Sequence, residues 1–205
     1  MDEMRQNNRV LLCGAPVGEA VFSHESRMER FYTFPLEVVR LSGTADRLNI
    51  VLRETQLASI RPSRAGLLEV RGELRSFNNR SGQGPRLVIS VFARQLESAP
   101  EPYWENLVEL TGTLCKKPNL RLTPTGREIC DLLLAVNRPY GRSDYLPCIA
   151  WGQTARTAAG WSVGQRLELQ GRFQSRDYFK TLDGLTVRRT AYEVSASGLT
   201  AIDGE

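Results

Sequence analysis

The residues best suited to carry chemistry are aromatic and cationic side chains that lie close together in the second half of the sequence. Four aromatic residues fall at predicted loops or strand ends: Tyr140, Tyr145, Trp151 and Tyr178. Five cations lie near them in the sequence: Arg138, Arg142, Arg172, Arg176 and Lys180. Aromatic faces stack on nucleobases while cations follow the phosphates of a single strand. The pattern favours a surface that binds single-stranded nucleic acid, since duplex DNA requires an element that enters a groove.

The same aromatic residues could instead belong to a hydrophobic core or to a subunit interface. Side chains alternate along a strand, so if Cys148 and Ala150 face inward, Trp151 faces the opposite side. Tyr178 stands in a polar hairpin and is expected to be exposed, whereas Trp104 and Trp161 are expected to pack against other residues. For Trp151 the pattern of residues leaves both interpretations open.

Catalysis and metal binding are not indicated by the remaining polar residues. The single histidine, His24, is predicted on a loop, so one chain forms no His-based triad or metal cluster. The glycine-rich segment at residues 79–86 lies between two predicted strands, whereas a phosphate cradle needs a helix N-terminus behind it. The four cysteines form no CxxC pair and are expected to be free thiols. We therefore expect no enzyme, no metal and no cofactor.

Composition places the chain among globular proteins with a mild preference for polyanions. Its 205 residues are enough for two domains of about 100 residues each. The net charge of +4 favours a nucleic acid as partner without requiring one. No apolar run reaches the roughly 18 residues of a membrane span, and the first residues lack the apolar core of a signal peptide. With free cysteines, these features predict a cytoplasmic protein that has no membrane partner.

The strands that must position these residues come from a duplicated sequence. "NRVLLCG" at residues 8–14 returns as "NLVELTG" at residues 106–112, and "LLEVRGELRS" at residues 67–76 returns as "RLELQGRFQS" at residues 166–175. Two matches at nearly one offset indicate a repeated domain rather than chance similarity between strands. We expect a first copy at residues 1–98, a linker at 99–105, and a second copy at 106–205.

Each copy is predicted to be all-β. In the first, β-branched and aliphatic runs predict strands at residues 9–22, 30–40, 46–52, 67–77 and 85–96, with a short helix at 54–60. In the second, strands are predicted at 106–123, 128–137, 145–151, 166–178 and 185–195, with a short helix at 153–159. Five strands with one helix between the third and fourth is the order of an OB-fold, so two tandem five-stranded barrels are expected. Gly14 and Gly112 stand where the first strand of each barrel must bend.

The second copy resembles the bacterial single-stranded DNA-binding protein family from Asn106 to about Ile202. The resemblance lies in "NLVELTGTLCKKPNLRLTPTGREICDLLLAVNR", in "YLPCIAWGQTARTAAGWSVGQRLELQGRFQSRDY", and in the order of their turns and strands. It implies sequence-nonspecific binding of single-stranded DNA in replication, recombination or repair. The base-stacking positions of the family fall on Tyr140, Tyr145, Trp151 and Tyr178. All four positions are aromatic here, which favours the binding interpretation of Trp151 over a place in the core.

The first copy departs from that pattern. Alignment of the copies places Arg47 opposite Tyr145, Arg53 opposite Trp151 and Asn79 opposite Tyr178. The first copy is therefore predicted to have lost most stacking residues and to contribute cations or assembly contacts. The cations assigned to the phosphate path are Lys116, Lys117, Arg138, Arg142, Arg172, Arg176, Lys180, Arg47 and Arg53.

The resemblance also bears on partners. Family members commonly work as four barrels, so it implies a homodimer of this two-barrel chain. They usually finish in an acidic tip that recruits replication and repair enzymes, whereas this sequence ends in "GLTAIDGE". Two alternatives remain from the sequence: an OB-fold protein of replication restart related to primosomal proteins, and an OB-fold scaffold for other proteins. RNA binding, the site size and a role on a mobile element are left open.

Overall fold

The structure is a computed structural model that describes residues 7–60, 66–79, 85–99, 101, 103–139, 141–182 and 185–202, without the side chains of Lys180, Leu182 and Leu185. The elements of the first copy are β1 (Asn8–Pro16), β2 (Val21–Ser26), β3 (Glu29–Val39), β4 (Ala45–Arg53), the 3₁₀ helix η1 (Glu54–Ser59), β5 (Leu68–Asn78) and β6 (Leu87–Ser98). Those of the second are β7 (Glu105–Leu114), β8 (Asn119–Leu122), β9 (Glu128–Arg138), β10 (Arg142–Trp151), the helix α1 (Gly152–Ala159), β11 (Arg166–Leu182) and β12 (Leu185–Ile202). The all-β prediction is confirmed.

Contacts group the chain into two compact units whose boundaries differ from those of the repeat. One, called the N-unit here, consists of Leu11–Glu105 together with Gln174–Tyr192. The other, the C-unit, consists of the described residues of Met1–Val10, Asn106–Phe173 and Glu193–Glu205. The N-unit thus contains a segment from the second copy, formed by the end of β11 and the beginning of β12.

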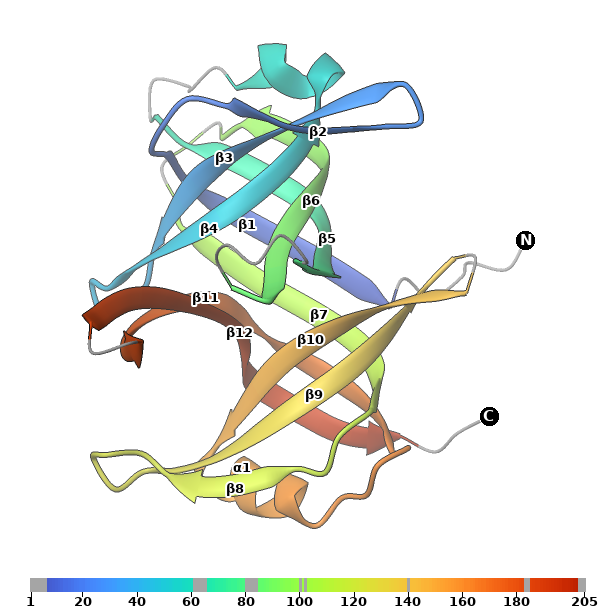
Figure 1. The fold of residues 1–205 in the computed structure, drawn as a ribbon, viewed down its shortest axis with the longest axis vertical. Helices are drawn as coiled ribbons and strands as arrows, with labels where there is room; N and C mark the ends of the chain where they lie inside the picture. The colour runs from blue at the N-terminus through green and yellow to red at the C-terminus, as the bar shows by residue number, and fades with distance from the viewer. Residues whose placement is uncertain are drawn as a thin grey trace. The chain divides into compact units, whose positions relative to one another are not determined.

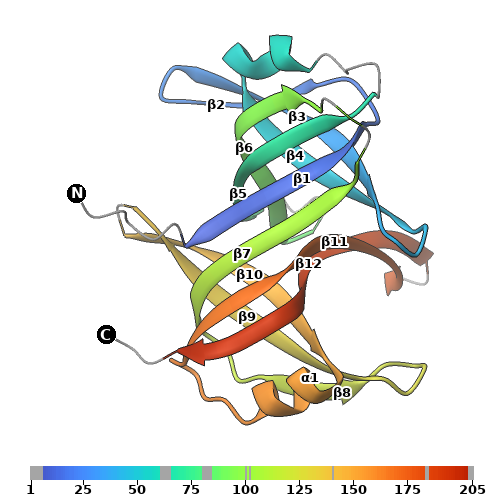
Figure 2. The same ribbon diagram turned by 180° about the vertical axis from the view of Figure 1, so that it is seen from behind.

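In each unit the strands close on themselves. The strand order of the N-unit is β2-β3-β4-β6-β5-β1, and an additional β3–β1 pairing closes the ring (Figure 1). The strand order of the C-unit is β7-β11-β12-β10-β9-β8, closed by a β7–β9 pairing (Figure 2). Closure places the short strands β2 and β8 outside the rings, paired to β3 and β9 respectively.

The closing pairs depend on close backbone approach at two glycines. In β1, a Cβ on Gly14 would lie 2.3 Å from the carbonyl oxygen of Glu37, next to the Ala15–Glu37 pair of β1 and β3. In β7, a Cβ on Gly112 would lie 2.9 Å from the carbonyl oxygen of Ala135, next to the Thr113–Ala135 pair of β7 and β9. A side chain at either position would push the closing strand away.

Each long first strand predicted from the sequence is wrong in one respect, because it is two strands rather than one. β1 ends at Pro16 before β2 begins at Val21, and β7 ends at Leu114 before β8 begins at Asn119, just after Pro118. Proline donates no backbone hydrogen bond, so it interrupts a ladder at this point in both copies. The break also moves His24 from the predicted loop onto β2, where its ring stacks on Phe31 with centroids 4.8 Å apart.

The core of each unit follows the period of two that strands impose. In β4 every second residue is buried, and the β4 residues Leu48, Ile50 and Leu52 have no exposed surface. β9 buries Leu132, Leu134 and Val136 in the same way. Three of the four cysteines, Cys13, Cys130 and Cys148, are also buried, and burial raises the pKa of the Cys148 thiol. Among the described helices, none is long and apolar enough to cross a membrane.

The predicted linker is partly packed against the N-unit. Ala99 is fully buried with Cys13 and Leu67, and Tyr103 packs against this cluster while its hydroxyl donates to Glu69. Trp104 was expected to pack and is instead 45% exposed. Tyr103, rather than the neighbouring tryptophan, is the aromatic residue that fixes this connection.

Candidate nucleic-acid interface

Two of the predicted stacking residues lie on one face of β10. Trp151 follows Tyr145 by six positions, an even step, so their side chains point to the same side of the strand. Tyr145 is 47% exposed and Trp151 36% exposed, while Leu146, Cys148 and Ala150 between them are buried. Trp151 therefore does not belong to the core of the C-unit. The two side chains form an accessible aromatic row that is interrupted on the same face by the half-buried Pro147 and the buried Ile149.

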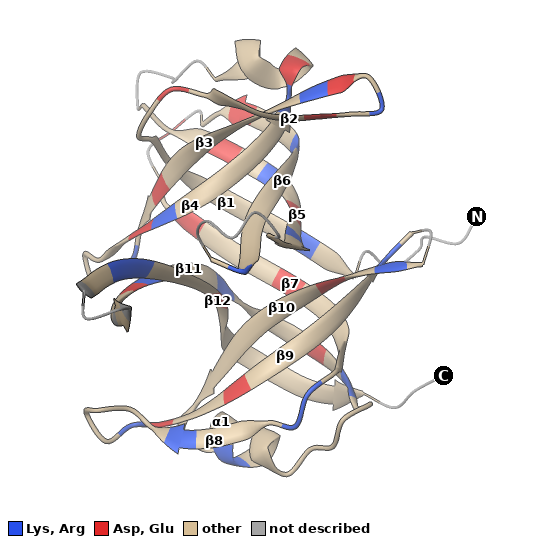
Figure 3. Cartoon of the chain, in the orientation of Figure 1, with Lys and Arg blue, Asp and Glu red and all other residues tan. Residues whose placement is uncertain are grey.

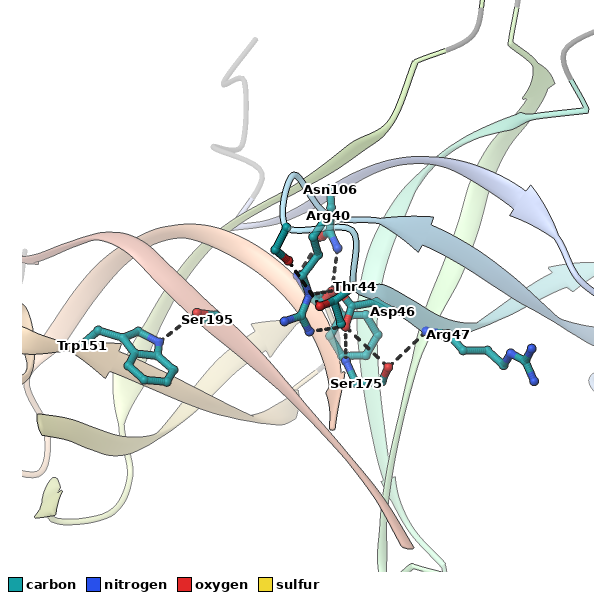
Figure 4. Close-up of polar contacts among 10 residues, drawn as sticks. Arg40, Thr44, Asp46, Arg47, Asn106, Trp151, Ser175 and Ser195 are labelled. Carbon is teal, nitrogen blue, oxygen red and sulfur yellow. Dashed lines mark hydrogen bonds and ion pairs between the residues drawn. The ribbon is translucent and has the colours of Figure 1, made fainter. Parts of the chain in front are cut away.

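The indole of Trp151 is held in a fixed orientation. Its Nε1–H donates to the hydroxyl oxygen of Ser195 at 3.0 Å, as Figure 4 shows. Ser195 is buried on β12, which pairs in parallel with β10 through the Ile149–Ser195 pair. The polar edge of this indole is bonded inside the protein while part of its surface stays accessible. Such a ring is suited to stacking a base, because its orientation is set before the ligand binds.

Tyr178 lies on β11 and belongs to the N-unit, whereas Tyr145 and Trp151 belong to the C-unit. It is 38% exposed, in agreement with the prediction that it is accessible. The neighbouring Asp177 accepts hydrogen bonds from Thr190 and Arg188 of β12, and these bonds hold the pKa of Asp177 below its usual range. The strands around Tyr178 are therefore joined by charged and polar side chains rather than by a core.

Two predicted residues cannot be placed. Tyr140 lies outside the described residues, as does the side chain of Lys180. Their assignment to the stacking and phosphate positions remains a prediction.

The predicted cations are not equally accessible. Lys116, Lys117, Arg142, Arg172 and Arg176 are exposed. Lys and Arg gather along β8 and the segment that leads into it, as the blue stretches of Figure 3 show. Within the part of the chain that the structure describes, neither Lys116 nor Lys117 forms an ion pair. These two lysines are accordingly available to an anionic ligand.

Arg138 is occupied by a structural role that the sequence analysis missed. Its Nε donates to Oδ2 of Asp144 at 2.5 Å, and its Nη2 donates to Oδ1 of the same carboxylate. The Asp144 side chain is fully buried and Arg138 is 25% exposed. The first copy repeats this pair, because Arg40 bonds the buried Asp46 through Nε at 2.6 Å and Nη2 at 2.5 Å. The pair joins the two strands on either side of the same turn in both copies.

The two arginines predicted in the first copy are both engaged by carboxylates. Arg47 lies 3.7 Å from Glu37 and is 66% exposed, which leaves it accessible. Arg53 bonds Glu29 at 2.7 Å and stands over the ring of Phe92, 5.1 Å from its centroid. Arg53, whose side chain is 32% exposed, therefore takes part in local contacts of the N-unit at the position aligned with Trp151.

Exposed aromatic residues beyond the predicted set are also present. Phe179 is 74% exposed next to Tyr178, on the opposite face of β11 by strand alternation. Phe22 on β2 is 52% exposed, and the guanidinium of Arg30 stands over the rings of both Phe22 and Tyr32. Glu54 accepts bonds from Arg30 and from the Tyr32 hydroxyl, so this cluster carries its own counterion. The β2–β3 aromatic residues could have been found in the sequence as a second group of phenylalanine, tyrosine and arginine.

Closed rings of strands with an accessible aromatic row define an all-β protein of the OB-fold class. Comparison with family models matches residues 105–202 to the single-strand binding protein family. The chain is 37% identical over 98 residues to the single-stranded DNA-binding protein of Clostridium tetani, a match that covers 44% of this chain and 66% of that one. Single-stranded DNA-binding protein A of Bacillus subtilis is 35% identical over 80 residues, or 36% and 46% of the two chains. Residues 105–202 therefore match the family of bacterial single-stranded DNA-binding proteins, and this match covers just under half of the chain.

A solved structure extends the likeness to the whole fold. The single-stranded DNA-binding protein from Thermus aquaticus superposes with a TM-score of 0.75 over 97% of this chain and 94% of that one, at 22% identity. At this identity the likeness concerns the fold alone. The chain spans about half to two thirds of the length of the curated relatives it matches.

Proposed function

We propose that this protein binds single-stranded DNA without sequence specificity and takes part in DNA replication, recombination or repair. The observation that carries the proposal is the accessible row of Tyr145 and Trp151 on β10, with the indole oriented by Ser195. Bases would stack on these rings and on Tyr178, while Lys116, Lys117 and the exposed arginines of β10 and β11 contact phosphates. No step of this function requires a catalytic group, and among the described residues no group of three or more His, Cys, Asp or Glu could hold a metal ion.

We further propose that the chain consists of two tandem OB-folds, one at residues 1–98 and one at 106–205, and that it forms a homodimer with four barrels. Support comes from the internal repeat and from the closed strand order of each unit. The second fold would supply the stacking residues, because the arginines aligned with Tyr145 and Trp151 in the first bind carboxylates instead. Light scattering on the eluting peak of a size-exclusion column measures the mass directly, and a monomeric mass would exclude the dimer.

Oligo-dT is expected to quench the intrinsic fluorescence of the protein, because a base stacked on Trp151 is in van der Waals contact with the indole. Raising the salt concentration should shift the titration to higher concentrations, since bound phosphates release counterions. A Trp151→Phe variant is the matched control: it retains Trp104 and Trp161 and should lose most of the quenching while still binding. An unchanged signal on adding oligo-dT to the unsubstituted protein, or equal affinity for a duplex of the same length, would exclude the proposal.

Replacing Tyr178 with alanine is expected to weaken binding of oligo-dT by about 1–3 kcal/mol, the usual value of one stacked base. Asn79→Ala, at the aligned position of the first copy, should have little effect. The two variants are to be compared by fluorescence titration under one buffer. Equal losses would contradict the division of labour between the copies while leaving single-strand binding intact.

A further inference from the structure

The segment Gln174–Tyr192, called the arm here, has an unusual position in the chain. It continues β11 and begins β12, two strands of the second copy, yet it clusters with Leu11–Glu105 in the N-unit. The arm includes Tyr178 and the exposed cation Arg176. What holds the arm therefore decides where one of the proposed stacking residues lies.

The base of the arm is bonded to β4 at a buried carboxylate. The backbone N–H of Ser175 donates to Oδ1 of Asp46 at 2.8 Å, and the Ser175 hydroxyl lies 3.5 Å from the same oxygen. In return, the backbone N–H of Arg47 donates to the Ser175 hydroxyl oxygen at 3.0 Å. Figure 4 shows these contacts together with Arg40, which holds the Asp46 carboxylate from the other side. Ser175 is thus joined both to a buried charge and to the backbone of the strand.

A second contact joins the other strand of the arm to β4. The Asn49 side-chain N–H donates to the hydroxyl oxygen of Tyr192 at 3.4 Å. Burial raises the pKa of Tyr192, in keeping with a phenol enclosed at this junction. Ser175 lies on β11 and Tyr192 on β12, so both strands of the arm are attached where it begins. Two attachments, one on each strand, fix the direction of the β11–β12 pair, whereas a single contact would let it pivot.

Strand alternation relates this attachment to Tyr178. Ser175, Asp177 and Phe179 face one side of β11, and Arg176 and Tyr178 face the other. A bond that fixes Ser175 against β4 therefore sets the side to which Tyr178 points. It also restricts the fluctuations of a strand pair that, around Asp177, is held by exposed polar contacts.

We propose that Asp46 and Ser175 are positioning residues for DNA binding, through which the first copy of the repeat orients Tyr178 of the second. The proposal rests on the single-strand binding proposed above and extends it. It gives the first copy a role that does not need the stacking residues it lacks. Asp46 also pairs with Arg40, as Asp144 pairs with Arg138 in the second copy, so replacing Asp46 would disturb the turn as well as the arm. The role of the arm is therefore tested at Ser175.

The experiment compares Ser175→Ala, Ser175→Thr and Ser197→Ala with the unsubstituted chain. Ser175→Ala removes the acceptor of the Arg47 N–H, whereas Ser175→Thr keeps a hydroxyl at the same place. Ser197→Ala is the matched control, because it removes an exposed hydroxyl of β12 outside the arm that donates to Gln170 of β11. Amide hydrogen exchange of peptides covering 174–192 is measured without DNA, and affinity for oligo-dT is measured separately.

Ser175→Ala is expected to speed exchange in the arm and to weaken oligo-dT binding about fivefold, the effect of one lost hydrogen bond. Ser175→Thr should restore both, and Ser197→Ala should change neither. In a Tyr178→Ala background the Ser175→Ala loss of affinity should vanish, because there is no longer a ring to position. Faster exchange with unchanged affinity, or a loss that persists without Tyr178, would overturn the positioning role alone. Failure of the unsubstituted chain to bind oligo-dT would instead overturn the proposed function, and the positioning role with it.

Discussion

Replacing Asp144 with alanine is expected to lower the free energy of unfolding by about 3–5 kcal/mol, because the change removes one partner of a buried ion pair. The Asp144 side chain is fully buried, and it accepts two hydrogen bonds from the guanidinium of Arg138. Without the carboxylate, a mostly buried cation loses the charge that compensates it. The measurement is the urea-induced unfolding of the variant, followed by circular dichroism.

The matched control for this variant is an ion pair that shares strand β9 with it. Asp131 on β9 bonds Arg121 on β8 at 2.5 Å, but both side chains are about 40% exposed. Exposed pairs contribute about 0–1 kcal/mol, so Asp131→Ala should unfold at nearly the same urea concentration as the unsubstituted protein. Similar losses in the two variants would show that burial does not set the energy of these pairs.

Replacing Gly171 with alanine is expected to destabilise the C-unit by about 1–3 kcal/mol, the usual cost of overpacking. An added Cβ would lie 2.3 Å from the carbonyl oxygen of Ser195 and 3.1 Å from the Cα of Ala196. Both contacts are with backbone, so no change of rotamer relieves them and β12 must move. Since the same Ser195 holds the indole of Trp151, a shift in tryptophan emission should accompany the loss of stability.

Gly160→Ala serves as its control. Gly160 follows α1 with an ordinary helical backbone, and the nearest atom to an added Cβ is the Thr157 carbonyl oxygen at 3.5 Å. This substitution should change the unfolding midpoint and the emission very little. A Gly171→Ala protein as stable as Gly160→Ala would contradict the close approach of β11 and β12 at this point.

The period of strands and the spacing of turns in the sequence are enough to predict an all-β chain, and the resemblance of the second copy predicts the family that residues 105–202 match. They also placed Trp151 on the opposite face from Cys148 and Ala150, where it is accessible. These features depend on local alternation, which the sequence records directly. The breaks after Pro16 and before Pro118 were missed, although proline marks both, because β-branched and apolar residues continue on either side of each break.

Features that depend on distant residues could not be predicted in the same way. Arg138 is close in sequence to the aromatic residues and was assigned to the phosphate path, but the turn brings it onto the buried Asp144 instead. The contact between Ser175 and Asp46 joins residues of different copies. Neither residue type nor spacing distinguishes Ser175 from the other exposed or half-buried serines of the second copy. Such contacts require the three-dimensional arrangement of strands.

The arm has a consequence for the order in which the protein can fold during synthesis. Residues 11–105 leave the ribosome before residues 174–192 have been translated, and domains generally begin to fold as they emerge. The N-unit nevertheless includes both segments. The Asp46 carboxylate can accept its hydrogen bond from Ser175 only after most of the second copy has been translated. The N-unit is therefore completed late in synthesis, when residues 174–192 join residues 11–105.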